Sequence, residues 1–386
     1  VYSEGYHDQF NQRMWQRLLW SPNVTLDEAL GEYTRTWFGP DAATTMAEAL
    51  LQLEENLSTP LATNVGIDRY YSLVRKAGRQ MPEPLREQSH LWRQHLEKSA
   101  LDKYVQLRLR RQLQIQMDTE ALFAKALRGD AQNLEAAIAQ AQSRLNEEIE
   151  TGEMKRLRAE ADRWGKESEQ LFGVRSEGLF NLDQDLVGLT WTRRQVQAAA
   201  ETHDPQRRRE LARLLAHYED AGAGGFYDDA GDPARSPHLT HGWPYGGDEG
   251  VSSVNRPSQR TLAFTAEGQQ GVTFEYHGLD AAAQYRVRFT LVRPTFLPRF
   301  AIRQPQKTES IFADGHCLAR ELELPEAEAK FFEFEIPREA TRDGDLKISF
   351  EKSNGVGEGP RPQIKVWRNT GGWGTLVSEV WLMKAR

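Results

Sequence analysis

The period with which apolar residues recur changes once along this chain, within the short stretch of residues 221–225. Before this stretch apolar residues recur every three or four positions, which is the spacing of one face of an α-helix. After it they recur every second position, which is the spacing of a half-buried β-strand. The stretch itself reads Ala-Gly-Ala-Gly-Gly, and runs of this kind interrupt regular structure. The sequence therefore predicts a helical domain followed by an all-β domain.

The helical half is predicted to be an antiparallel bundle of roughly eight helices. Thr25 and Glu28 have the spacing of a capping box, in which a hydroxyl and a carboxylate each bind a backbone N–H at the start of a helix. A helical pattern also extends from residue 85 to about residue 127. Helices of that length are rare in compact domains, so we expect a break near Ser99 or Asp118. A further helix, expected over residues 6–20, carries an apolar stripe made of Phe10, Met14, Trp15, Leu18 and Leu19.

The second half contains several short segments in which apolar and polar residues alternate, separated by Gly and Pro clusters. Many short strands at this spacing predict a β-sandwich or a jelly roll. Trp381 occupies an inward position of its segment and is expected in the core. The alternating segments are residues 272–276, 285–289, 332–336, 346–350 and 377–382.

Composition excludes several classes of partner. No run of 18 apolar residues occurs, so no membrane-spanning segment and no membrane partner are expected. The formal net charge is −7, which disfavours non-specific binding to nucleic acid, since that affinity comes mainly from neutralising phosphates. Cys317 is the only cysteine, so neither an internal disulfide nor a cysteine metal cluster is expected.

The opening residues suggest the end of a larger domain. Val1 stands where an initiator Met is usual, and we interpret the first residues as the last strand of a truncated (β/α) barrel. Glu4 would then lie at the carboxyl end of that strand, where barrel enzymes hold their catalytic acids, bases and nucleophiles. The alternative is that Glu4 is a loop or helix-capping carboxylate. Neighbouring candidates for substrate binding on the same rim are Tyr2, His7 and Asp8.

Three acidic residues follow the change of period directly. Asp228, Asp229 and Asp232 offer the hard oxygen ligands that Ca²⁺ prefers, so calcium is the one cofactor that the sequence suggests. Their spacing differs from that of an EF-hand loop. The alternative is an Asx-turn linker that holds the β domain against the helices.

One cluster of aromatic residues and histidines and one separate tryptophan are candidates for binding a sugar. His238 and His241 stand close to Trp243 and Tyr245, a combination of ring faces and polar groups that suits a saccharide. The two histidines also suggest a metal site, although no third ligand is specified, and an ordered loop over the domain junction is the remaining alternative. Trp373, in a Gly-rich loop, is the best candidate of the β half for stacking on a ligand.

Several short runs together resemble a known class of enzyme. Tyr-Ser-Glu-Gly at residues 2–5 and Leu-Leu-Trp-Ser-Pro at residues 18–22, with Tyr33 and Trp-Phe-Gly at residues 37–39, resemble the passage out of the catalytic barrel in bacterial glycoside hydrolases. The α-glucuronidase-like and hexosaminidase-like enzymes show similar runs. The runs at residues 224–229, 237–239 and 378–382 are similar to the C-terminal sandwich of large secreted bacterial proteins of the same build.

The resemblance implies that this chain is the C-terminal region of a glycoside hydrolase-like protein. Residues 1–8 would end the barrel, residues 9–220 would form the helical bundle, and residues 221–386 would form a jelly-roll sandwich of the galactose-binding type. The implied partners are a polysaccharide or oligosaccharide and the protein's own N-terminal catalytic barrel, in a secreted or periplasmic setting. The chain alone would then be inactive as an enzyme. The alternative is a non-catalytic scaffold whose β-sandwich docks another protein.

Overall fold

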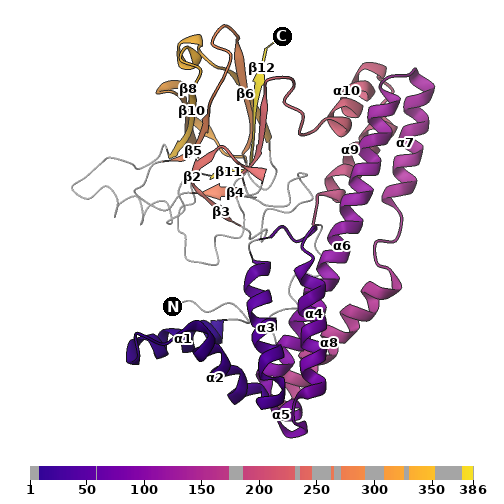
Figure 1. Ribbon diagram of the computed structural model, residues 1–386. Helices are drawn as coiled ribbons and strands as arrows, with labels where there is room; N and C mark the ends of the chain where they lie inside the picture. The colour runs from indigo at the N-terminus through magenta and orange to yellow at the C-terminus, as the bar shows by residue number, and fades with distance from the viewer. Residues whose placement is uncertain are drawn as a thin grey trace. The chain divides into compact units, whose positions relative to one another are not determined.

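The computed structural model in Figure 1 describes residues 8–57, 59–173, 186–230, 235–245, 262–264, 271–291, 308–325, 330–352 and 376–385. In this part of the chain ten α-helices precede a series of antiparallel β-sheets. The last helix ends at Ala216 and the first strand begins at Phe226, so the change of period predicted the change of structure. Contacts group the chain into two compact units, residues 1–114 with 148–184 and residues 115–147 with 185–386.

The first unit is helical in its described residues. Its helix α2 begins with the predicted capping box, because the Glu28 backbone N–H donates to Thr25 Oγ1 over 3.2 Å and the Thr25 N–H donates to the Glu28 carboxylate over 3.0 Å. The helix ends at Gly39, whose φ of +85° favours glycine, and Pro40 begins the next helix. The helices are α1 (Asp8–Trp20), α2 (Leu26–Phe38), α3 (Pro40–Asn56), α4 (Gly66–Gln80), α5 (Glu83–Gln88), α8 (Gly152–Phe172) and the first part of α6 (His90–Ala126).

Helix α6 corrects one prediction. It runs unbroken for 37 residues, so the break expected near Ser99 or Asp118 is wrong. The stretch contains neither Gly nor Pro, and Ser99 turns its hydroxyl back onto the Leu96 carbonyl oxygen within the helix. The interruption lies earlier, at Ser89, whose Oγ accepts a hydrogen bond from the backbone N–H of Trp92 and so caps α6.

The second unit contains the remaining helices and the strands. Helix α7 (Ala131–Leu145) begins at Asp130, whose carboxylate accepts the Asn133 N–H over 3.0 Å. It packs beside α9 (Leu189–Glu201), and Arg193 of α9 donates to the Leu145 carbonyl oxygen at the end of α7 over 2.9 Å. Helix α10 (Pro205–Ala216) packs on α9 in turn. No helix in the described part of the chain has both the length and the apolar character that a membrane crossing needs.

Two antiparallel sheets share one hydrophobic core in the second unit. The four-stranded sheet has the order β1-β12-β6-β9 and the five-stranded sheet has the order β2-β5-β10-β7-β8, while β11, β4 and β3 form a third, small sheet. We call these strands the β domain. They are β1 (Phe226–Asp229), β2 (Leu239–His241), β3 (Trp243–Tyr245), β4 (Leu262–Phe264), β5 (Val272–Tyr276), β6 (Tyr285–Leu291), β7 (Thr308–Ala313), β8 (His316–Glu323), β9 (Lys330–Glu335), β10 (Leu346–Lys352), β11 (Leu376–Val377) and β12 (Glu379–Lys384).

Alternation in the sequence predicts which side chains enter this core. Val287 and Phe289 of β6 face Phe274 and Phe350 of the other sheet, and all four are fully buried. The last predicted strand, residues 377–382, is divided at Ser378, whose N–H donates to the Thr290 carbonyl oxygen over 3.0 Å. The β domain therefore has a core of the expected kind, built mainly from aromatic and β-branched residues.

Candidate functional site

Strand β1 carries two adjacent carboxylates that are both fully buried. Asp228 pairs with Val380 of β12 and Asp229 pairs with Glu379. Successive residues of a strand point to opposite faces, so the two carboxylates lie in different environments. Asp228 lies on the core side of the four-stranded sheet, and Asp229 lies on its outer side. Buried charges of this kind need partners, and the partners differ for the two residues.

Asp228 connects the two sheets through hydrogen bonds. Tyr276 of β5, in the five-stranded sheet, donates its hydroxyl to Asp228 Oδ2 over 3.0 Å. The backbone N–H of His238 donates to Oδ1 over 3.2 Å, and His238 Nδ1 lies 3.0 Å from both carboxylate oxygens. Burial raises the pKa of the Tyr276 phenol well above its usual range, and the charge of Asp228 raises it further. Tyr276 therefore stays a hydrogen-bond donor to this carboxylate.

His238 reaches solvent, whereas Asp228 and Tyr276 are fully buried. Its ring stacks on Tyr276 at 4.6 Å between centroids and meets the Phe226 ring edge-on at 4.8 Å, and 21% of its side chain is exposed. Because Asp228 accepts from Nδ1, the neutral ring presents Nε2 as an acceptor. The arrangement holds an imidazole in one orientation beside aromatic rings. We call Asp228, His238, Tyr276 and Phe226 the His238 corner.

The outer face of the same sheet holds a second polar group. Glu379 is fully buried and accepts hydrogen bonds from three hydroxyls, those of Tyr218 at 3.0 Å, Tyr227 at 3.1 Å and Thr290 at 3.0 Å. Burial raises the pKa of Tyr227 well above its usual range, and the charge of Glu379 adds to this effect. Trp381 adds a further hydrogen bond to Tyr218, because its Nε1–H donates to the Tyr218 carbonyl oxygen over 2.9 Å.

This second group has a structural role. Tyr218 lies between α10 and β1, and its ring meets Trp191 of α9 and Trp381 of β12 at 5.1 and 5.3 Å between centroids. It therefore fastens the connection between α10 and β1 to the outer face of the sheet. Asp229 belongs to the same region through Arg235, whose Nη1 lies 3.5 Å from Asp229 Oδ2 and which also pairs with Glu219.

The structure describes two of the three residues of the predicted calcium site, Asp228 and Asp229. Asp228 and Asp229 are neighbours on β1 but point to opposite faces of the sheet, and each is engaged by other side chains of the protein. Asp232 lies outside the described residues, so the calcium site stays a prediction. Among the described residues no group of three or more His, Cys, Asp and Glu side chains is arranged to hold a metal ion. The alternative prediction was an Asx-turn linker at these residues. In its described part, Asp228 accepts hydrogen bonds and Asp229 forms an ion pair with Arg235.

The remaining predicted sugar-binding residues are only partly described. His241 ends β2, three residues beyond His238, and Trp243 and Tyr245 lie on β3 in the small third sheet. The side chains of Trp243 and Tyr245 are not among those described. Asp8 begins α1, but its side chain is likewise not described. Besides Asp232, four predicted residues lie wholly outside the described part of the chain, namely Tyr2, Glu4, His7 and Trp373.

Sequence reasoning did not identify Tyr276 or Glu379. Tyr276 ends a predicted strand and gives no local sign of a partner 48 residues earlier. Glu379 left a weak sign, because a charged residue stands two positions before a tryptophan in an otherwise apolar segment and so shares a face with it. Comparison with models of known protein families and with the sequences of curated proteins finds no match for this chain. The functional conclusions therefore depend on the geometry of the described residues and on the sequence itself.

Proposed function

We propose that this chain is the helical and β part of a carbohydrate-active protein, in which the β domain binds a glycan and the helices support a catalytic domain. The observation that carries the proposal is the His238 corner, where a carboxylate orients an imidazole beside aromatic rings at the protein surface. Sugars present hydroxyls to polar groups and C–H faces to rings, so this chemistry suits a saccharide. Two antiparallel sheets around one core support a jelly-roll module of the galactose-binding type.

The proposal assigns distinct tasks to the parts of the chain. His238 Nε2 would accept a hydrogen bond from a sugar hydroxyl, while Asp228 keeps the ring in the tautomer that this requires. Catalysis would belong to a (β/α) barrel, with Glu4 as its candidate carboxylate at the barrel rim. The chain would then be inactive alone, and its setting would be secreted or periplasmic, where polysaccharides are encountered.

The test replaces His238 by phenylalanine and measures glycan binding. His238→Phe keeps a ring against Tyr276 but removes both nitrogens, so we expect affinity for the bound glycan to fall about tenfold, the loss of roughly one hydrogen bond. A glycan array identifies the ligand, and titration calorimetry measures the change. The matched control is His277→Phe, since His277 also lies 3.0 Å from a carboxylate, that of Asp345, but in an exposed setting. Binding of no glycan by the wild type, or equal affinity of His238→Phe, contradicts the proposal.

A second candidate function is a protein-docking scaffold, and α1 favours it. The predicted stripe of this helix is not buried as a whole: Phe10 contacts Tyr33 of α2 at 5.4 Å between ring centroids, but Trp15 is 70% exposed and Leu19 is 80% exposed. Exposed apolar side chains at this density are typical of a surface that contacts another protein. When the wild type and a Trp15→Gln, Leu19→Gln double variant are each immobilised and exposed to the same cell lysate, the variant is expected to lose a partner protein that the wild type retains. If both retain the same set of proteins, α1 is not a docking surface.

A further inference from the structure

A hollow of about 340 Å³ lies between α1 and α2, within the first unit. The two helices are neighbours within the first unit (Figure 1). They are joined by the Phe10–Tyr33 ring contact and by an ion pair between Arg17 Nη2 and Glu32 Oε2 at 3.0 Å. Its volume falls within the range of small-molecule sites, roughly 300–1,000 Å³. The sequence drew attention to Tyr33 and Trp37 only as part of a family resemblance, not as a binding site, and neither candidate function above uses the hollow itself.

The lining combines flat rings with groups that form hydrogen bonds. Trp37 is half exposed, and its ring lies 6.5 Å from that of Tyr33, at an angle of 50°. The amides of Gln12 and Gln16 and the hydroxyl of Thr36 add both donors and acceptors. An exposed indole face beside amides and a hydroxyl matches a sugar ring, which has an apolar C–H face and a polar rim.

The charged groups of the lining favour a negative ligand. Two guanidinium groups, of Arg13 and Arg17, and one carboxylate, of Glu32, line the hollow. Arg17 is paired with Glu32, but its Nε is buried and has no hydrogen-bond partner among the described residues. Among the described residues Arg13 donates only to the Gln16 side-chain oxygen, over 3.3 Å, and no described carboxylate lies within ion-pair distance of it. One positive charge therefore remains to bind a carboxylate, a pairing that arginine makes well.

We propose that the hollow between α1 and α2 binds an acidic saccharide, with the Arg13 guanidinium on the sugar carboxylate and the Trp37 indole against the sugar ring. This site is independent of the His238 corner, because it lies on the helical unit and uses other residues. An acidic peptide offers the same carboxylate, but it lacks the apolar C–H face and the ring of hydroxyls that would contact the indole and the neutral hydrogen-bonding groups. We therefore propose the saccharide as the ligand, and the acidic peptide serves as a comparison compound in the test.

The experiment titrates the full chain with a trimer of galacturonic acid, a neutral trimer of galactose and a glutamate tripeptide. Calorimetry is expected to show the acidic trimer binding about tenfold more tightly than the other two, because only it satisfies both the charge and the ring. Arg13→Gln is expected to weaken the acidic trimer about tenfold, while Arg13→Lys recovers part of that loss. Trp37→Leu is expected to weaken both sugars about fivefold or more.

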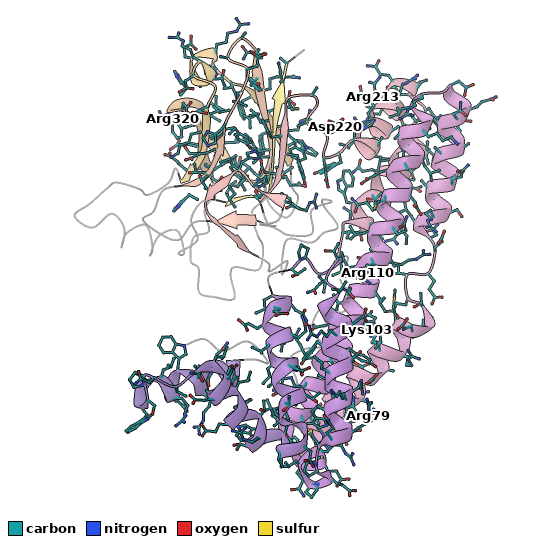
Figure 2. All side chains as sticks on the ribbon, in the orientation of Figure 1. Arg79, Lys103, Arg110, Arg213, Asp220 and Arg320 are labelled. Carbon is teal, nitrogen blue, oxygen red and sulfur yellow. The ribbon has the colours of Figure 1, made fainter. Side chains whose placement is uncertain are left out.

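Two control variants match these changes at exposed sites that do not line the hollow. Trp15→Leu removes an exposed indole from α1 itself, and Arg79→Gln removes an exposed guanidinium near the end of α4, where Figure 2 labels it. Both are expected to bind the acidic trimer within about twofold of the wild type. The proposal is overturned if the acidic trimer does not bind, if the tripeptide binds more tightly, or if Arg13→Gln leaves the affinity unchanged. His238→Phe is expected to leave this binding intact, so failure of one site is distinguishable from failure of the other.

Discussion

Trp381→Ala is expected to lower the free energy of unfolding of the β domain by about 3–5 kcal/mol, the usual cost of removing a large buried aromatic side chain. Trp381 is only 2% exposed. Its ring contacts those of Tyr227, Tyr218 and Phe331 at 5.1, 5.3 and 5.7 Å between centroids. The truncation would also leave the Tyr218 carbonyl oxygen without the donor that Trp381 Nε1 provides.

Hydrogen exchange of the β12 and β1 amides measures this loss directly, because these strands pair with one another beside Trp381. Trp381→Phe keeps a ring but not the N–H, so an intermediate loss is expected. The control is Trp20→Ala at an 87% exposed position, which should stay within about 0.5 kcal/mol of the wild type. If Trp381→Ala exchanges like the control, the aromatic contact does not stabilise the domain.

Glu379→Ala is expected to cost about 2–4 kcal/mol, although it removes a charge from the interior. The hydroxyls of Tyr218, Tyr227 and Thr290 donate to Glu379 and would lose this acceptor, the Thr290 hydroxyl in a fully buried setting and the two phenols in a partly buried one. Glu379→Gln keeps one acceptor oxygen and should cost less. We expect the loss to appear first at Tyr218, because that contact fastens the connection from α10 to the sheet.

Limited proteolysis between α10 and β1 tests this expectation, together with the denaturation midpoint. Glu379→Ala should be cut faster than the wild type in this connection, and Glu379→Gln should be intermediate. The control is Glu333→Ala on the same sheet, since Glu333 pairs with Arg286 and Arg288 in an exposed setting, where ion pairs contribute at most about 1 kcal/mol. Equal cutting of all three variants would show that the buried carboxylate does not hold the connection.

Local chemistry explains the parts of the fold that could be predicted. The capping box of Thr25 and Glu28 depends on groups three residues apart, and the structure forms it as expected. The alternation of residues 272–276 describes one strand and its buried face, which β5 confirms. In both cases the interacting groups, or the repeat itself, lie within a few residues of one another. Trp381 is buried, but on the outer face of the four-stranded sheet beside Tyr218 and Tyr227. Its neighbours Val380 and Leu382 enter the core between the sheets, so the inward position expected for Trp381 is wrong.

Two predictions about the helices differ from the structure, for different reasons. Helix α6 was expected to break because long helices are rare, but no residue within it ends a helix, and Asp118 is engaged by Arg144 of α7. The apolar stripe of α1 was identified correctly as a stripe, yet only its Phe10 side is packed on α2. Periodicity shows which residues share a helix face, but it does not show how much of that face a neighbour covers.

The order of the helical and β regions, the place where one gives way to the other, and the alternating core of the strands were all determined by the sequence itself, since they depend on periodicities of two and 3.6 residues. The partners of Asp228 and Glu379, and the gathering of Arg13 and Trp37 around one hollow, were decided only by tertiary structure. A buried carboxylate must find donors wherever the chain brings them, and for Glu379 one of these donors is 161 residues away. No local sequence pattern predicts a contact between residues so far apart, because the contact results from the packing of whole helices and strands.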